Sequence, residues 1–474
     1  MQVIPKPGIL CFHTKVLKRG TCMETLYQNT VVIKRLRKYF QPYISLLTKP
    51  SGHKAFMLML AILAMQFTTS INHIFKWFLC GICDKSLNSY YYFLKHTCVP
   101  WDKFLKITIE LAVSLIPEEL ADLPIFLAID DTLQEKFGTR FECYQTMFDH
   151  SKHNGTNYLK GHCFVAMTIC IPVLIGKDIR YFHIPVGHRL RKDGENKLKI
   201  ASTLIDMAMK ALVDHPMVIL LCDSWYPKGD VVKAVKRHKN LEMIANARVD
   251  TCIFELPPPH TGKRGRPATK GRQLDIHNPD DFHYIRVGDY FVTVKEVLTN
   301  LFGTETLIYL TVTAADLSKH NTYRVFISTV LPKHLNQQFR GREKTLSQKL
   351  NAQILWLLPL YLYSFRWGIE IMFYEQKTFW SLGLYRIRSK EGIESFVNLS
   401  SLAYSCMCIL PHLDERFSCL VHESPQTCKY LLGDAIRYEL FLWRFDSKTE
   451  NHIYSLSFLD SFNSTGDTGS KVVA

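Results

Sequence analysis

The chain has 474 residues, of which 47% are hydrophobic and 12% aromatic, enough apolar material for a large core and about two to four structural units. Its formal net charge of +15 favours a polyanionic partner, because Lys and Arg side chains gain from neutralising phosphates. Fourteen cysteines in so long a chain do not indicate a disulfide framework. We therefore expect a globular protein of a reducing cytosol, with no signal peptide and no membrane partner.

Residues 1–120 are predicted to form a helical N-terminal DNA-binding domain. From about residue 31 the apolar residues recur at spacings of three and four, with few Gly or Pro residues. The most apolar stretch, 56–65, is too short to span a bilayer, which predicts a buried helix. Two short helices at 70–78 and 86–95 have the length of a helix-turn-helix, although two ordinary packed helices would give the same pattern.

Residues 121–250 are predicted to form the first part of an α/β core. Apolar runs rich in β-branched and aromatic residues alternate here with polar turns, which is typical of strands in a sheet. An amphipathic helix is expected at 197–214. The expected strands are 123–131, 161–175, 179–190 and 216–225.

Residues 251–338 are predicted to be a β-rich insertion with a basic loop, because strand-like runs follow one another here without intervening helices. The loop contains Lys263, Arg264 and Arg266 around a Gly-Arg-Pro core and resembles the AT-hook type of minor-groove binder. We expect these three side chains to contact DNA. A solvated loop without a ligand is the alternative.

Residues 339–415 are predicted to be the second part of the core. A long apolar helix is expected from about 347 to 382, broken or kinked near Pro359. Residues 416–474 are expected to form a C-terminal helical segment and a flexible tail, since the last residues are rich in Ser, Thr, Asn and Gly.

Two expected strands end in aspartate residues. Alternation along the first strand places Asp130 and Thr132 on one face and Asp131 on the other. Asp223 directly follows the apolar run of another strand, and α/β sheets bind ligands at the carboxyl ends of their strands. Each aspartate alone is a weak signal, because a turn or a helix cap also uses this residue.

The long helix contains a polar stripe formed by Tyr363, Arg366, Glu370 and Lys377. At about 100° per residue, these four positions fall within roughly 60° of one another. Most other residues of the segment are apolar, so the stripe is expected to face protein or ligand. An ion-paired structural helix is the alternative, because Arg366 and Glu370 are spaced i,i+4.

Together, Asp130, Asp223 and Glu370 would provide hard oxygen ligands for Mg²⁺, which Mn²⁺ could replace. Two such ions would activate the attacking water or hydroxyl and stabilise the leaving oxygen of a phosphodiester. The flanking Arg366 and Lys377 would offset phosphate charge.

These residues resemble a known family. Tyr363, Arg366, Glu370 and Lys377 match the Y-x2-R-x3-E-x6-K signature of bacterial insertion-sequence transposases of the DDE superfamily. The preceding strand ends agree with this resemblance, which extends from about residue 123 to 410.

The resemblance implies an RNase H-like catalytic core interrupted by the β-rich insertion. It implies metal-dependent cleavage at transposon ends followed by strand transfer into target DNA. Asp130, Asp223 and Glu370 would be the catalytic and metal-binding residues. Tyr363, Arg366 and Lys377 would contact DNA phosphates, and the protein would work as a homodimer on paired terminal inverted repeats in the bacterial cytoplasm, at the nucleoid.

One feature departs from the family pattern. Relatives that form a DNA hairpin use a tryptophan of the insertion to stack on a flipped base, and this chain has none between Tyr226 and Ile354. Tyr284, Tyr290 or Phe291 could take that place. Two other functions remain open: a catalytically inactive DNA-binding protein derived from a transposase, and a related nuclease that does not transfer strands.

Overall fold

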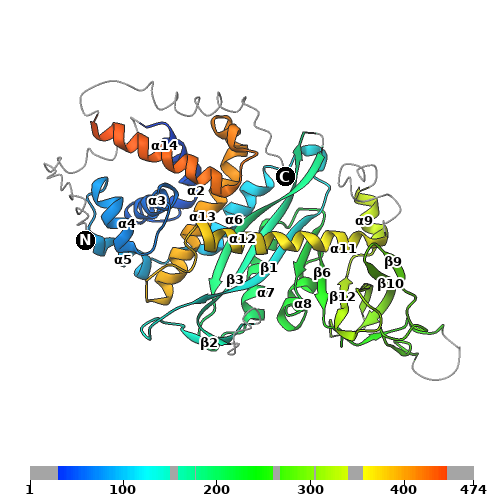
Figure 1. Ribbon diagram of the computed structural model, residues 1–474. Coiled ribbons are helices and arrows are strands. Elements are labelled where there is room, and N and C mark those ends of the chain that lie inside the picture. The colour runs from blue at the N-terminus through cyan, green and yellow to red at the C-terminus, as the bar shows by residue number, and fades with distance from the viewer. Residues whose placement is uncertain are drawn as a thin grey trace, which may run out of the picture.

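The computed structural model describes residues 30–149, 158–176, 178–259, 267–303, 306–339 and 356–445. Within them the protein is a mixed α/β structure built on one large sheet with helices on both sides (Figure 1). The expectation of an α/β protein is confirmed at this level.

The sheet has strands from both the expected core and the expected insertion. Its hydrogen-bonded order is β2-β3-β1-β5-β6-β12-β11-β10-β7-β8, with β4 also paired to β3 and β9 to β10. The strands are β1 (Ile125–Glu135), β2 (Gln145–Phe148), β3 (Tyr158–Ile175), β4 (Asp178–Leu190), β5 (Val218–Cys222), β6 (Leu241–Ala247), β7 (Ile253–Phe254), β8 (Gln273–Leu274), β9 (Ile285–Val287), β10 (Tyr290–Thr299), β11 (Thr306–Ala314) and β12 (Tyr323–Ser328).

Strand direction divides the sheet into two parts. Strands β1, β5 and β6 are parallel, and α7 (Lys197–Ala211) and α8 (Gly229–Arg237) lie in the connections that lead to β5 and β6. The remaining neighbours are antiparallel, and β12 pairs with β6, so the strands after β6 extend the same sheet. Parallel strands buried on both faces require continuous apolar runs, which β1 and β5 provide.

Within the described residues, five α-helices precede the sheet: α2 (Val32–Ile44), α3 (Lys49–Ala64), α4 (Ile71–Trp77), α5 (Leu87–His96) and α6 (Trp101–Val113). Helix α3 has residues 55–64 all at most 1% exposed, which confirms the predicted buried helix. It lies against α13 (Lys390–Leu413) and α14 (Pro425–Phe445), as Figure 1 shows at the blue and orange end of the molecule.

The helix expected at 347–382 is not one regular α-helix. Residues 340–355 lie outside the described part of the chain, and α11 (Leu358–Tyr363) is followed by a 3-10 turn at Ser364–Arg366 and then by α12 (Trp367–Phe379). Pro359 lies in the first turn of α11, where a missing N–H costs nothing, so it starts a helix and does not kink one. Tyr363 and Arg366 therefore lie before the regular helix that contains Glu370.

Helix α13 is apolar and long enough to cross a membrane by length and composition. However, 94% of its most apolar window is buried inside the protein, against β4 and the N-terminal helices. This burial is typical of the core helix of a globular protein. The tail expected after residue 445 lies outside the described residues.

Candidate active site

Two aspartates meet where the parallel pairing of β1 with β5 ends. The expectation that both strands end in aspartate holds for β5 and is wrong for β1, which continues past Asp130 to Glu135 because it stays paired with β3. Ile129 and Cys222 are paired in register, so Asp130 and Asp223, which follow them, are neighbours on adjacent strands. The Asp130 side chain is 13% exposed. Strand pairing thus brings two carboxylates that are distant in the sequence to one sheet edge.

The third carboxylate comes from α12, which lies across the sheet next to β1, β3 and β4 (Figure 1). Arg366 Nη1 donates to Asp130 Oδ2 at 3.1 Å and to Glu370 Oε1 at 3.1 Å. Arg366 is 13% exposed and Glu370 is 40% exposed. The guanidinium therefore connects Glu370 to the sheet, a contact that a purely structural i,i+4 pair within one helix would not make.

Asp131 faces the opposite side of β1, as alternation predicts. Its Oδ1 accepts hydrogen bonds from Lys197 Nζ on α7 and from Tyr226 Oη, both at 2.9 Å. The side chain is 15% exposed. Asp131 is thus committed to an ion pair on the α7 face, whereas Asp130 faces Arg366.

The site holds more negative charge than its surroundings offset. Burial, followed by the charges of Asp223 and Glu370, raises the pKa of Asp130 to about 8. Burial also raises the pKa of Asp223, although Trp225 N–H donates to its Oδ1 at 3.0 Å. Carboxyl groups with raised pKa values in a polar cluster are typical of functional sites.

The donor chemistry fits a divalent cation, because carboxylate oxygens are the hard ligands that Mg²⁺ prefers. As the side chains stand, Arg366 lies between Asp130 and Glu370. No three His, Cys, Asp or Glu side chains of the described ranges converge closely enough to hold a metal ion. Coordination by all three carboxylates would therefore require the guanidinium to leave its present position.

The other stripe residues flank this cluster. The Tyr363 ring centroid lies 5.8 Å from Arg366 Cζ and 5.1 Å from the ring of Phe326 on β12. Burial raises the pKa of Tyr363, so its hydroxyl stays protonated. Lys377 is exposed, about two turns beyond Glu370 on α12.

Some of the predicted DNA-contacting residues of the insertion lie in the described part of the chain and others do not. Lys263, Arg264 and Arg266 lie outside the described residues. Tyr284 donates its hydroxyl to Ile276 O at 2.6 Å and is partly buried. Tyr290, at the start of β10, is 54% exposed and presents its ring to solvent.

Sequence reasoning missed the surroundings of Trp225. Two ammonium groups contact its ring, with Lys197 Nζ 4.1 Å and Lys228 Nζ 4.5 Å from the ring centroid. Such distances are those of cation–π contacts. The sequence feature that could have indicated these contacts is the Trp225-Tyr226 pair, which lies two residues after Asp223.

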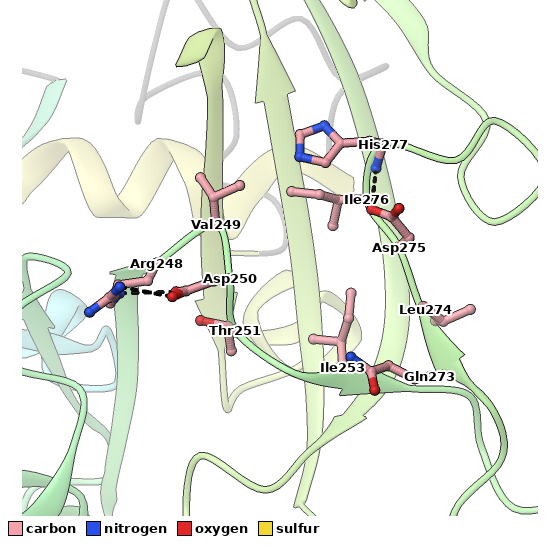
Figure 2. Close-up of a pocket in the computed structure, with 10 residues that line it drawn as sticks. All are labelled: Arg248, Val249, Asp250, Thr251, Ile253, Gln273, Leu274, Asp275, Ile276 and His277. Carbon is pink, nitrogen blue, oxygen red and sulfur yellow. Dashed lines mark hydrogen bonds and ion pairs between the residues drawn. The ribbon is translucent and has the colours of Figure 1, made fainter. Parts of the chain in front are cut away.

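A cavity of about 800 Å³ lies in the segment after β6 (Figure 2). Arg248, at its rim, is committed to Asp250, with Nε and Nη2 2.9 and 2.8 Å from the two carboxylate oxygens. Asp275 Oδ1 accepts from the backbone N–H of His277 at 3.0 Å, as the second dashed contact in Figure 2 shows. Among the described residues that line the cavity, the two carboxylates, Asp250 and Asp275, are each held by a local contact, unlike the carboxylate cluster at Asp130.

Comparison with known proteins identifies a family for part of the chain. The sequence matches the family described as DDE superfamily endonuclease over residues 46–287, just over half of the chain. The matched span contains Asp130 and Asp223 and ends before Glu370. A search of curated proteins found no match. Endonucleases of this superfamily act on DNA and typically use divalent metals. On the matched span, the chain belongs to the DDE superfamily of endonucleases.

Proposed function

We propose that this protein is a DNA transposase, which cleaves DNA at the ends of a mobile element and joins those ends to target DNA. The observation that carries the proposal is the convergence of Asp130, Asp223 and the Arg366–Glu370 pair where the parallel pairing of β1 with β5 ends. The antiparallel β4-β3-β1 unit beside parallel β5 and β6 supports an RNase H-like core.

In this proposal Asp130, Asp223 and Glu370 are the catalytic residues and hold Mg²⁺. The ion supplies a Lewis acid beside the scissile phosphate and a water or hydroxyl of lowered pKa. The protein's own residues supply charge balance and position. Arg366, once released from Asp130, has a guanidinium that can bind a DNA phosphate with two hydrogen bonds. Lys377 provides a second positive charge further along α12.

DNA as substrate is supported by charge and by the surface of the N-terminal helices. The chain has a net charge of +15, which favours binding to phosphates. Helices α4 and α5 expose aromatic and basic side chains together, with Trp77 68% and Tyr92 65% exposed beside Lys76 and Lys95. Exposed aromatic rings next to cations suit nucleic acid, so we assign residues 1–120 to recognition of the transposon ends.

The finer assignments rest on the signature around Glu370. Its match supports membership of the Y-x2-R-x3-E-x6-K group, an origin in a bacterial insertion sequence and a place at the nucleoid of the bacterial cytoplasm. We also propose a homodimer on paired terminal inverted repeats. An inactive DNA-binding derivative is disfavoured because all three carboxylates and Arg366 remain in place.

The test compares wild type with Glu370→Gln on labelled DNA that carries the flanking ends of the element, with and without Mg²⁺. Metal-dependent nicking at the terminus and a joined product, both lost in the variant, are expected. Glu391→Gln, at an exposed carboxylate on α13, is the matched control and should behave as wild type. Nicking without joining would indicate a nuclease, and tight binding without cleavage by wild type would indicate a DNA-binding protein.

A further inference from the structure

Helix α12 approaches β4 unusually closely at Gly368. A Cβ atom added to Gly368 would lie 2.2 Å from Nδ1 and 2.3 Å from Cε1 of His183, whereas ordinary contacts of this kind begin at 3.4 Å. The glycine therefore lets the helix backbone rest directly against an imidazole ring. Alanine at this position would require the helix or the ring to move by about 1 Å.

The ring of His183 has little freedom to yield. Its Nε2 lies 3.3 Å from Sγ of the fully buried Cys170, the residue paired with it across β3 and β4. Its Nδ1, on the side of Gly368, is buried and has no hydrogen-bond partner among the described residues. The sheet thus holds the ring from behind, and a larger residue on α12 would push the helix outward.

Gly368 lies between Arg366, which contacts Asp130, and Glu370, which contacts Arg366. Arg366 precedes it by two positions and Glu370 follows it by two, on a continuous helical stretch. Any outward shift of this turn therefore moves both away from Asp130, which is held by β1. Misplacement of a reacting group by about 1 Å is enough to cost roughly a hundredfold in rate.

We propose that Gly368 and His183 form a positioning contact that sets the distance between Glu370 and the sheet carboxylates, a role that rests on the proposed function. In this role neither residue needs to contact substrate. Gly368 sets the distance by lacking a side chain, and His183 sets it as the fixed surface on which α12 rests. The contact requires a pair of complementary sizes, so a smaller residue at 183 should compensate for a larger one at 368.

The test uses four proteins: wild type, Gly368→Ala, His183→Ala and the double variant. Mg²⁺-dependent DNA cleavage should fall by roughly a hundredfold in Gly368→Ala and recover to within about tenfold of wild type in the double variant. The melting temperature of Gly368→Ala should fall, although alanine favours a helix more than glycine does, and should recover in the double variant. Gly433→Ala on α14, whose Cβ would lie 2.9 Å from Leu63 O, is a matched control that should lose stability but keep its cleavage rate.

A second readout separates this proposal from the proposed function. Mg²⁺ should raise the melting temperature of wild type and of the double variant more than that of Gly368→Ala, because only the first two hold Glu370 near Asp130. Failure of wild type to cleave DNA would refute the transposase assignment alone. The positioning role would be overturned if Mg²⁺ raised the melting temperature of wild type and Gly368→Ala equally, or raised neither. It would also be overturned if the double variant cleaved DNA no faster than Gly368→Ala.

Discussion

Replacing Asp130 by Asn should stabilise the metal-free protein while abolishing cleavage. The pKa of Asp130 is raised from 3.8 to about 8, so ionising this carboxyl in the folded protein is unfavourable. The folded state binds this proton more tightly than the unfolded state does. The contribution to stability is therefore full below about pH 4 and is lost as the pH rises to about 8.

The size of the effect follows from that shift. A difference of roughly four pKa units corresponds to about 5–6 kcal/mol at the upper limit. Asn still accepts a hydrogen bond from Arg366, but a neutral acceptor is weaker, which reduces the gain. We expect the variant to be more stable than wild type by about 2 kcal/mol or more at pH 8, with a gap that widens by up to about 1.4 kcal/mol per pH unit between about pH 5 and 8.

Urea unfolding in EDTA at pH 5, 6.5 and 8 measures this gap, and the neighbouring carboxylate supplies the control. Asp131→Asn should be destabilised by about 2–3 kcal/mol, since it weakens the bonds from Lys197 and Tyr226 and leaves the ammonium without its anion. The two substitutions, at adjacent aspartates, are therefore expected to change the free energy of unfolding in opposite directions. Loss of stability in Asp130→Asn that is equal at every pH would refute the reasoning.

Three further outcomes are expected. Lys197→Met should cost about 3 kcal/mol in urea unfolding because Asp131 stays buried without a cation, and adding Asp131→Asn should restore most of it. Glu439→Ala should cost about 1–2 kcal/mol in the same assay, since this buried carboxylate accepts three backbone N–H groups at the start of α2. Mg²⁺ should raise the melting temperature of wild type by mass action, and the rise should be much smaller in Glu370→Gln. A shift of equal size in both proteins would count against Glu370 as a ligand.

The local patterns of the sequence were sufficient to place the two aspartates on buried strands, but not for the bounds of β1 or for the break between α11 and α12. Period-two alternation separated Asp130 from Asp131, and the structure places them on opposite faces of β1. The apolar run before Asp223 predicted the buried strand β5. These properties depend on residues close in the sequence, so a single chain reveals them.

Long-range contacts were not visible in the same way. The i,i+4 spacing showed that Arg366 could pair with Glu370, but its bond to Asp130 depends on how α12 crosses the sheet. Likewise, the sequence around Gly368 does not predict its close contact with His183, which lies on β4. Packing of distant elements decides both contacts, and periodicity contains no information about it.

The charge balance of the site explains why Arg366 occupies its present position. Arg366 pairs with both Asp130 and Glu370, whereas Asp131 is paired with Lys197 on the other face of β1. The charges of Arg366 and Lys197 both act on Asp223. Burial, and then the charges of Asp223 and Glu370, raises the pKa of Asp130, so the cluster carries an excess of negative charge that this buried site disfavours. A divalent cation would offset that excess and reduce the need for the guanidinium at Asp130, so metal binding and release of Arg366 toward a DNA phosphate should be linked. In that case Mg²⁺ should strengthen DNA binding by wild type more than by Arg366→Met. An equal effect on both proteins would show that metal binding and the release of Arg366 are not linked.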